Sequence, residues 1–289
     1  MKWAVMIEAE QLWNLMSEEQ LRGLERRSIE VAAGVTLHVV VRAGTGEPII
    51  LLHGIWGWWG YWRALLGRTP DVFAGRPLML VDLRGHGASD KPARGYALDD
   101  YAADIEAVVQ SLPDTPVSLV GHSLGALTSL LVAGKLPERI RSIVLEDPPL
   151  PAPRGGVDAF RGVYELKQEP LDAIIEQLLL WNPEMSSASA RESATCMKAT
   201  ADAVFTATFD PQHLAPEIPT PGVVLHCPAL VLPAGNPERR ALRPGGLDML
   251  RGVCPRLEEV VIPGTSHTVL RDAPDAYAER LTAFFAGEG

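Results

Sequence analysis

Short apolar runs alternate with stretches of helical periodicity along most of this chain, and this alternation restricts its fold more than any other feature. Runs rich in leucine or β-branched residues are expected as strands, and the amphipathic stretches between them as helices. The pattern predicts an α/β protein with a mostly parallel sheet flanked by helices. Eight strands are predicted, the first two as a hairpin: 28–32, 36–43, 48–54, 78–83, 117–123, 142–147, 229–235 and 257–264.

Two segments interrupt this alternation. Residues 1–27 read as an N-terminal helical extension, because Leu12, Leu15 and Met16 indicate a short helix and Ser17 with Gln20 has the spacing of a capping box. Residues 148–225 open with four prolines within six positions, which end the preceding strand. Helical periodicity follows at 171–179 and 187–205. We therefore predict a helical cap over 148–225, inserted in a core formed by 28–147 and 226–289.

Composition narrows the class of protein. With 289 residues, 47% of them hydrophobic, the chain can build a large core without disulfides or a structural metal. The net charge of -10 argues against a nucleic-acid partner, which cationic side chains would have to bind. Three cysteines without a CxxC pair fit neither a disulfide framework nor a zinc site. No export signal or membrane span is found, so a cytoplasmic protein without a membrane partner is expected.

The residues with the clearest chemistry are Gly121-His122-Ser123-Leu124-Gly125, which follow an apolar strand and open a helix. A sharp turn between strand and helix exposes the serine hydroxyl, and side chains at the two glycine positions would collide with the neighbouring backbone. Ser123 is therefore predicted to be a nucleophile. A serine needs a base to remove its proton, and His267, just past the last predicted strand, is the expected base.

Four motifs taken together resemble the α/β-hydrolase fold family. They are His53-Gly54, residues 82–89 (DLRGHGAS), the segment around Ser123, and Gly264-Thr265-Ser266-His267, in the order that the family shows. The resemblance covers residues 28–289 and implies that two backbone N–H groups, those of Ile55 and Leu124, hold the oxyanion of the reaction. It says little about the substrate. No metal or cofactor is expected, because the sequence has neither clustered ligands at metal spacing nor a phosphate-binding glycine loop.

The acid that orients His267 is less clear. Members of the family usually carry an aspartate after the seventh strand, where this chain has Asn236 and, two residues later, Glu238. An asparagine cannot neutralise an imidazolium, so Asn236 is a poor candidate. A minority of relatives place the acid after the sixth strand, where Asp147 stands here. Asp147 is the preferred assignment and Glu238 the alternative.

Tryptophans offer the only hints about the substrate. Four of the seven lie between positions 56 and 62, directly after the expected oxyanion turn. Trp58, Trp59 and Trp62 have helical spacing and either line a pocket or pack the first helix on the sheet. Trp56 is expected to face the substrate, and Trp181, at the end of a cap helix, to close the pocket from above.

These features together predict a serine hydrolase that cleaves a small carboxylic ester or lactone with an apolar or aromatic group. A carbon–carbon bond hydrolase or a perhydrolase of the same fold would carry the same residues. A ligand receptor without turnover is a further alternative. The chain could also form a homodimer through residues 1–27.

Overall fold

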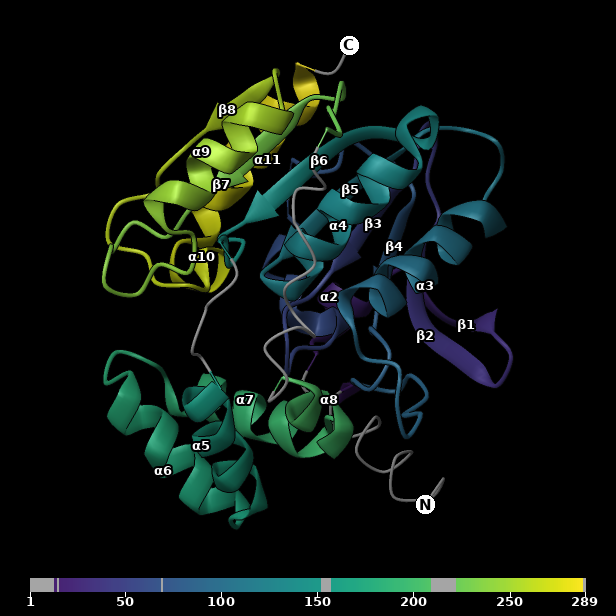
Figure 1. Ribbon diagram of the computed structural model, residues 1–289. Coiled ribbons are helices and arrows are strands. Elements are labelled where there is room, and N and C mark those ends of the chain that lie inside the picture. Colours follow the sequence, from purple (N-terminus) through teal and green to yellow (C-terminus); the bar gives the residue numbers. More distant parts are fainter. Residues whose placement is uncertain (1–12, 15, 69, 152–156, 209–221, 288–289) are drawn as a thin grey trace.

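An eight-stranded sheet forms the centre of the protein in the computed structural model, which describes residues 13–14, 16–68, 70–151, 157–208 and 222–287 (Figure 1). The strand order is β1-β2-β4-β3-β5-β6-β7-β8, and β2 runs antiparallel to both of its neighbours while all other pairs are parallel. The predicted fold is confirmed. The strands are β1 (Leu24–Ala32), β2 (Val35–Arg42), β3 (Ile49–Leu52), β4 (Leu78–Val81), β5 (Val117–His122), β6 (Ile140–Glu146), β7 (Ala229–Leu232) and β8 (Leu257–Glu259).

Helices cover both faces of the sheet, and the central parallel strands β3, β4 and β5 are accordingly buried throughout. In β3, Ile50 and Leu52 pack into the cluster that includes α3 (Leu98–Ser111) and α4 (Leu124–Lys135). Ile49 and Leu51 alternate with them and face the 3₁₀ helix η1 (Trp59–Leu65) and α11 (Pro274–Ala286). The core-packing interpretation of Trp58, Trp59 and Trp62 is confirmed, because all three are buried in this second cluster.

The shorter helices lie at the edges of this core. They are α2 (Glu18–Leu21), η2 (Pro137–Arg139), α9 (Pro244–Val253) and α10 (Val269–Asp272). The predicted capping box of α2 is present, with the Ser17 and Gln20 side chains each accepting from the other residue's backbone N–H. The helix predicted around Leu12 and Leu15 lies outside the described residues. The first strand begins at Leu24, four residues before its predicted start and within the segment predicted as an extension.

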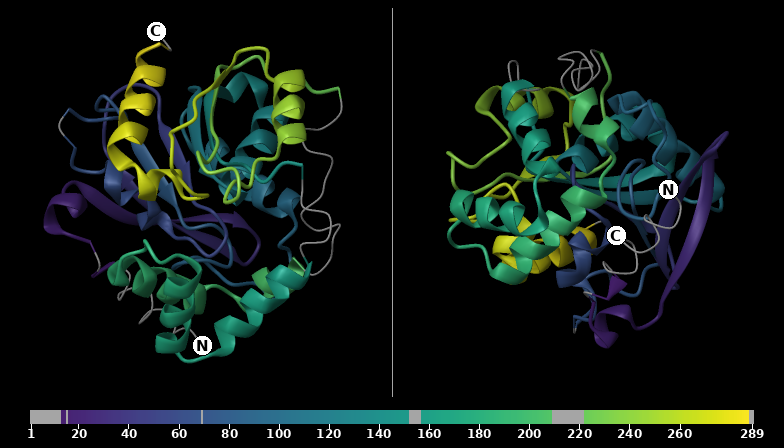
Figure 2. Two further views of the ribbon diagram at one scale, coloured as in Figure 1. Left: turned by 90° about the vertical axis from the view of Figure 1, so that its left-hand side faces the viewer. Right: turned by 90° about the horizontal axis from the view of Figure 1, so that it is seen from below.

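Four helices, α5 (Val157–Gln168), α6 (Leu171–Trp181), α7 (Ser187–Ala199) and α8 (Asp202–Ala207), gather beyond one end of the sheet (Figure 2). The helix predicted over 187–205 is in fact two helices, α7 and α8. The chain breaks at Thr200 and Ala201 because Ala201 N donates to Gly85 O of the core, which removes it from the helical ladder. None of the helices in the described ranges is both long and apolar enough to cross a bilayer.

Candidate active site

Ser123 lies on a strained turn between β5 and α4. Its backbone has φ 51° and ψ −111°, a conformation that residues other than glycine seldom adopt. The two glycines of the turn are required by space: a Cβ on Gly121 would lie 2.4 Å from the Gly125 carbonyl, and one on Gly125 would lie 2.1 Å from Leu52 O. The steric reason given for the motif is therefore confirmed, and the serine is held where β5 meets α4.

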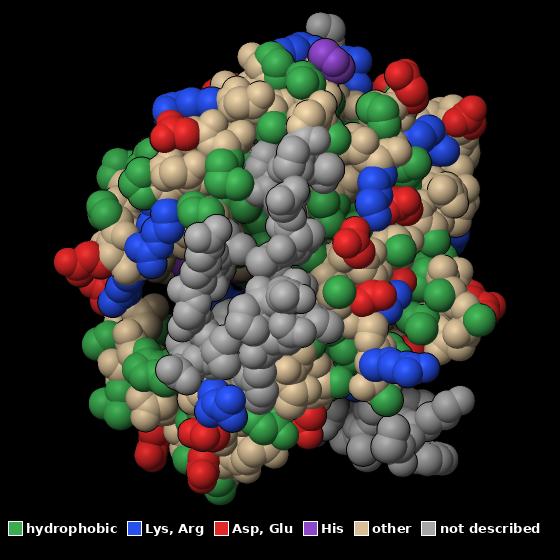
Figure 3. Space-filling model, viewed as in Figure 1, with side chains coloured by type: hydrophobic (Ala, Val, Ile, Leu, Met, Phe, Trp, Pro, Cys, Tyr) green, Lys and Arg blue, Asp and Glu red, His purple; other side chains and the backbone are tan. Residues whose placement is uncertain are grey.

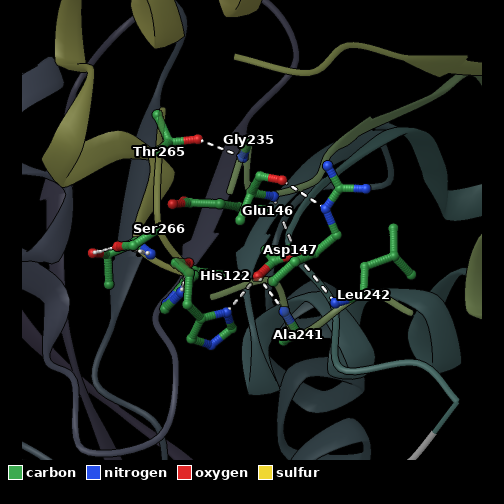
Figure 4. A network of polar contacts seen from close by, with 12 residues as sticks. His122, Glu146, Asp147, Gly235, Ala241, Leu242, Thr265 and Ser266 are labelled. Atoms are coloured by element: carbon green, nitrogen blue, oxygen red, sulfur yellow. Dashed lines mark hydrogen bonds and ion pairs between the residues drawn. The ribbon is translucent and has the colours of Figure 1, made fainter. Parts of the chain in front are cut away.

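Asp147 follows β6 and contacts the imidazole of His267. His267 Nδ1 lies 2.7 Å from Asp147 Oδ2, and the aspartate is fully buried. Three backbone N–H groups of the segment after β7 also donate to this carboxylate, those of Ala241 at 2.8 Å and of Ala234 and Leu242 at 3.2 Å (Figure 4). Because Nδ1 donates its proton to the carboxylate, Nε2 of a neutral His267 is left with a lone pair that can accept one.

The alternative acid does not reach this histidine. Glu238 is exposed, and its backbone N–H donates to Asn236 Oδ1 at 3.0 Å. The segment after β7 thus contributes backbone N–H donors to Asp147 and no carboxylate to His267. Of the two acids left open by the sequence, the structure brings Asp147 to the imidazole.

His122 links the turn of Ser123 to the segment of His267. Its Nε2 donates to His267 O at 3.0 Å, and the two imidazole rings are 4.8 Å apart. Burial, reinforced by the nearby His267, lowers the pKa of His122 well below its usual value, so this ring is neutral. No direct Ser123–His267 hydrogen bond is formed among the described residues. Such bonds are often loose in free enzymes and tighten when substrate binds.

The expected oxyanion donors flank Ser123. A Cβ on Gly54 would lie 3.1 Å from Ser123 Cβ, so the turn after β3 packs directly against the serine. His53 fixes this turn, because its Nδ1 donates to Gly54 O at 2.7 Å and its Nε2 accepts from Leu83 N at 3.0 Å. The N–H groups of Ile55 and Leu124 donate to no other group in the described part of the chain, which leaves them available to an oxyanion.

The two tryptophans predicted to bind substrate have different surroundings. Trp56 has a φ of 61°, and its ring stacks on Phe205 of α8 with the ring centres 5.5 Å apart. It therefore lies where α8 meets the turn after β3. Trp181 is 53% exposed at the last position of α6, next to Leu180, which is 73% exposed. The expectation that Trp181 closes the pocket is corrected, because α6 ends at the surface and turns this side chain to solvent.

Glu146, immediately before Asp147, is a feature of the site that the sequence analysis missed. Its carboxyl is fully buried, and Oε1 accepts from Tyr61 Oη at 2.6 Å and from Leu270 N at 2.9 Å. The Tyr61 ring in turn stacks on His122, with the ring centres 4.7 Å apart. Glu146 thus holds the segment that follows His267 in place through the hydrogen bond from Leu270 N. Strand alternation placed its side chain opposite Asp147, but its partners come from distant segments that no local pattern reveals.

The buried position of Glu146 predicts a pH dependence of stability. Burial raises the pKa of this carboxyl from 4.5 to about 8, so the folded state keeps its proton where the unfolded chain loses it. Stability should fall as pH rises from 4.5 to about 8, by up to about 1.4 kcal/mol per pH unit from this group. Glu146→Gln cannot ionise and should lack this contribution.

Urea unfolding of both proteins between pH 5 and pH 8 measures the effect. The difference in unfolding free energy between the wild type and Glu146→Gln should shrink, or turn in favour of the variant, as pH rises. Glu279→Gln, at an exposed position of α11, is the matched control and should follow the wild type. Parallel curves for the wild type and Glu146→Gln would contradict the prediction.

The described residues contain no group of three or more His, Cys, Asp or Glu side chains arranged to hold a metal ion. The site instead combines a serine on a strained turn, an imidazole paired with a buried carboxylate, and two N–H groups beside the serine. This combination, on a sheet of this topology, forms a candidate site for a nucleophilic serine.

Residues 47–274 match the family model of the alpha/beta hydrolase fold. The chain belongs to this family. It is 41% identical over 113 residues to 2-(acetamidomethylene)succinate hydrolase of Mesorhizobium japonicum, a match that covers 39% of each chain. It is 32% identical over 126 residues to N-formylmaleamate deformylase of Pseudomonas putida, covering 42% of this chain and 45% of the relative. The matched segments thus span less than half of these curated relatives.

Solved structures share the fold over most of the chain. Est816, described as an N-acyl homoserine lactone degrading enzyme, aligns with a TM-score of 0.68 at 21% identity, covering 89% of this chain and all of the other. A sequence identity of 21% supports a shared fold and says nothing about a shared activity. The sequence matches and the structural match agree on the α/β-hydrolase architecture, and the curated relatives named here are hydrolases.

Proposed function

We propose that the protein is a serine hydrolase that cleaves a carboxylic ester or lactone through an acyl-enzyme. The observation that carries the proposal is the 2.7 Å pair of His267 and Asp147 beside the strained turn of Ser123. Ser123 attacks the carbonyl carbon while His267 Nε2 takes its proton. Asp147 stabilises the resulting imidazolium, and the N–H groups of Ile55 and Leu124 hold the oxyanion. Water, activated by His267, then releases the acyl group.

The surroundings of the serine favour a substrate with an apolar or aromatic part. The stacked rings of Trp56 and Phe205 provide an aromatic surface one residue beyond Ile55. A serine nucleophile, in place of an aspartate, favours acyl transfer over the alkyl-enzyme chemistry of epoxide hydrolases. The same residues would also serve a carbon–carbon bond hydrolase or a perhydrolase, and the names of two relatives extend the range of substrates to amides.

Turnover of p-nitrophenyl esters tests the proposal. The wild type is expected to release p-nitrophenol over many cycles, and rapid quenching should trap an acyl group on the peptide that contains Ser123, visible as a mass increase. A receptor would show ligand-shifted melting without turnover. Absence of both turnover and acylation across esters, lactones and amides would overturn the proposal.

A further inference from the structure

A cavity of about 360 Å³ lies between the cap and the core. One wall comes from the segment 182–189, between α6 and α7, and the other from the segment 264–272 that carries His267. Ser266 and Thr268, the two neighbours of His267, both line it. Figure 3 shows Lys and Arg side chains along one side of a hollow in this face of the molecule. The segment that carries His267 therefore forms part of the cavity wall, and the exposed residues of the lining open the cavity to solvent.

Arg271 lines this cavity and carries a charge that no acid neutralises. Its guanidinium is half-buried, and Nη1 donates to Ser193 Oγ of α7 at 3.0 Å. Within the described ranges, no carboxylate lies at ion-pair distance from Arg271, whereas Arg63 and Arg84 pair with Glu192 and Asp104. A partly desolvated cation without a counter-ion gains more from an anionic ligand than one already paired with an acid.

The guanidinium of Arg271 is linked to the turn of Ser123 through two ring contacts. Its Cζ lies 5.8 Å from the centre of the Tyr61 ring, which stacks on His122, the residue before Ser123. The positive charge of Arg271 also opposes protonation of His122 and lowers its pKa. Arg271 therefore lies on the side of His122, near the segment that holds the nucleophile.

The rim of the cavity carries mixed charge. Arg239 lies there, exposed and bonded to Asn182 Oδ1 at 3.1 Å, without an acid at ion-pair distance among the described residues. The two acids that line the cavity, Glu184 and Asp272, are also exposed, and Asp272 Oδ2 already accepts from Ser266 N at 2.6 Å. Arg271 is therefore the charge best shielded from water and the one an anionic group would meet deepest in the cavity.

We propose that this cavity binds a carboxylate of the substrate through Arg271, with Arg239 assisting at the rim. The substrate class is then an ester or lactone that carries a free carboxylate on one side of the scissile carbonyl and an apolar group on the other. The planar guanidinium suits a carboxylate, because two parallel N–H donors match its two oxygens. This inference rests on the proposed hydrolase function and narrows its substrate.

The test compares two esters of equal chain length, mono-p-nitrophenyl glutarate, which ends in a carboxylate, and p-nitrophenyl pentanoate, which does not. Arg271→Met should lower kcat/KM for the glutarate by roughly 100-fold and for the pentanoate by less than about threefold, as expected for loss of one charge-assisted contact. Arg271→Lys should recover part of the loss on the glutarate, because the charge remains but the paired donors do not.

Two control variants separate recognition from support of the cap. Ser193→Ala removes the bond between Arg271 and α7 but keeps the cation, and it should leave the preference for the glutarate unchanged. Arg280→Met, at an exposed position of α11, should have no effect on either ester. If Arg271 only held the cap in place, Arg271→Met would slow both esters equally and Ser193→Ala would do the same, which overturns the inference.

Binding of glutarate itself, measured by calorimetry, keeps the two proposals apart. If the wild type is neither active on nor acylated by any of the esters, lactones and amides, the proposed function fails. The subsite is then judged by whether glutarate binds to the wild type and binds at least about 10-fold more weakly to Arg271→Met. If the wild type hydrolyses both esters with equal kcat/KM and does not bind glutarate, the function stands and the carboxylate subsite is refuted.

Discussion

Replacing Asp147 with asparagine is expected to lower kcat by about 10⁴-fold. The amide keeps the size of the side chain, but its NH₂ group accepts no hydrogen bond, so either His267 Nδ1 and Ala241 N or Ala234 N and Leu242 N lose their acceptor. It also supplies no negative charge to the imidazolium that forms when Ser123 loses its proton. Because His267 Nδ1 is only 2.7 Å from Asp147 Oδ2, the substitution changes the hydrogen-bond partner of the base directly. Steady-state hydrolysis of a p-nitrophenyl ester by the variant and the wild type measures the loss in kcat.

Glu238→Gln is the matched control for this substitution. It makes the same carboxylate-to-amide change at the other candidate position, where the side chain is exposed and does not contact His267. We expect kcat within about twofold of the wild type, as is usual for surface substitutions away from the reacting groups. Circular dichroism and the unfolding midpoint should show that both variants fold. The opposite ranking of the two variants would assign the acid to Glu238.

Ser123→Ala is expected to reduce turnover even further, by about 10⁶-fold, with only the stabilisation of the oxyanion left to accelerate attack by water. The fold should be retained, because alanine fits the same space and the glycines around it are unchanged. The variant should also fail to form the acyl adduct seen by mass spectrometry in the wild type, while still binding substrate.

Ser142→Ala provides the comparison for this loss. Ser142 is also buried, but it lies near the start of β6 and donates to Ser118 Oγ at 2.9 Å, at the opposite end of the sheet strands from Ser123. The Ser142→Ala substitution should lower the free energy of unfolding and leave kcat within about threefold of the wild type. A Ser123→Ala enzyme that still turns over at a tenth of the wild-type rate would rule out an acyl-enzyme on this serine.

The sheet and the turn of Ser123 could be predicted from sequence because their signals are local. Strands such as β3 and β5 are short apolar runs, and the glycines at 121 and 125 report a steric requirement of the turn itself. The break between α7 and α8 could not be foreseen, since it depends on a hydrogen bond from Ala201 to Gly85, 116 positions away in the chain.

The acid could be narrowed to two candidates but not chosen from spacing alone. The choice depends on the backbone of Asp147, whose φ of 39° is left-handed, and on three N–H donors from the segment after β7. These are properties of the packed molecule. The same limit applies to Trp181, whose exposure follows from where α6 ends, and to Arg271, whose surroundings come from three separate segments.

Glu146 and Asp147 are neighbours in sequence with opposite surroundings, one enclosed beneath the histidine segment and the other against its imidazole. The two-residue repeat of β6 and the left-handed backbone at Asp147 together give the two carboxyls these different surroundings. Insertion of one residue within β6 would move Glu146 to the position beside the imidazole and carry Asp147 beyond it, whereas deletion of one residue would bring Pro148 there. Gain of a single codon would therefore change which acid faces the imidazole in a descendant of this chain, with no substitution at either position.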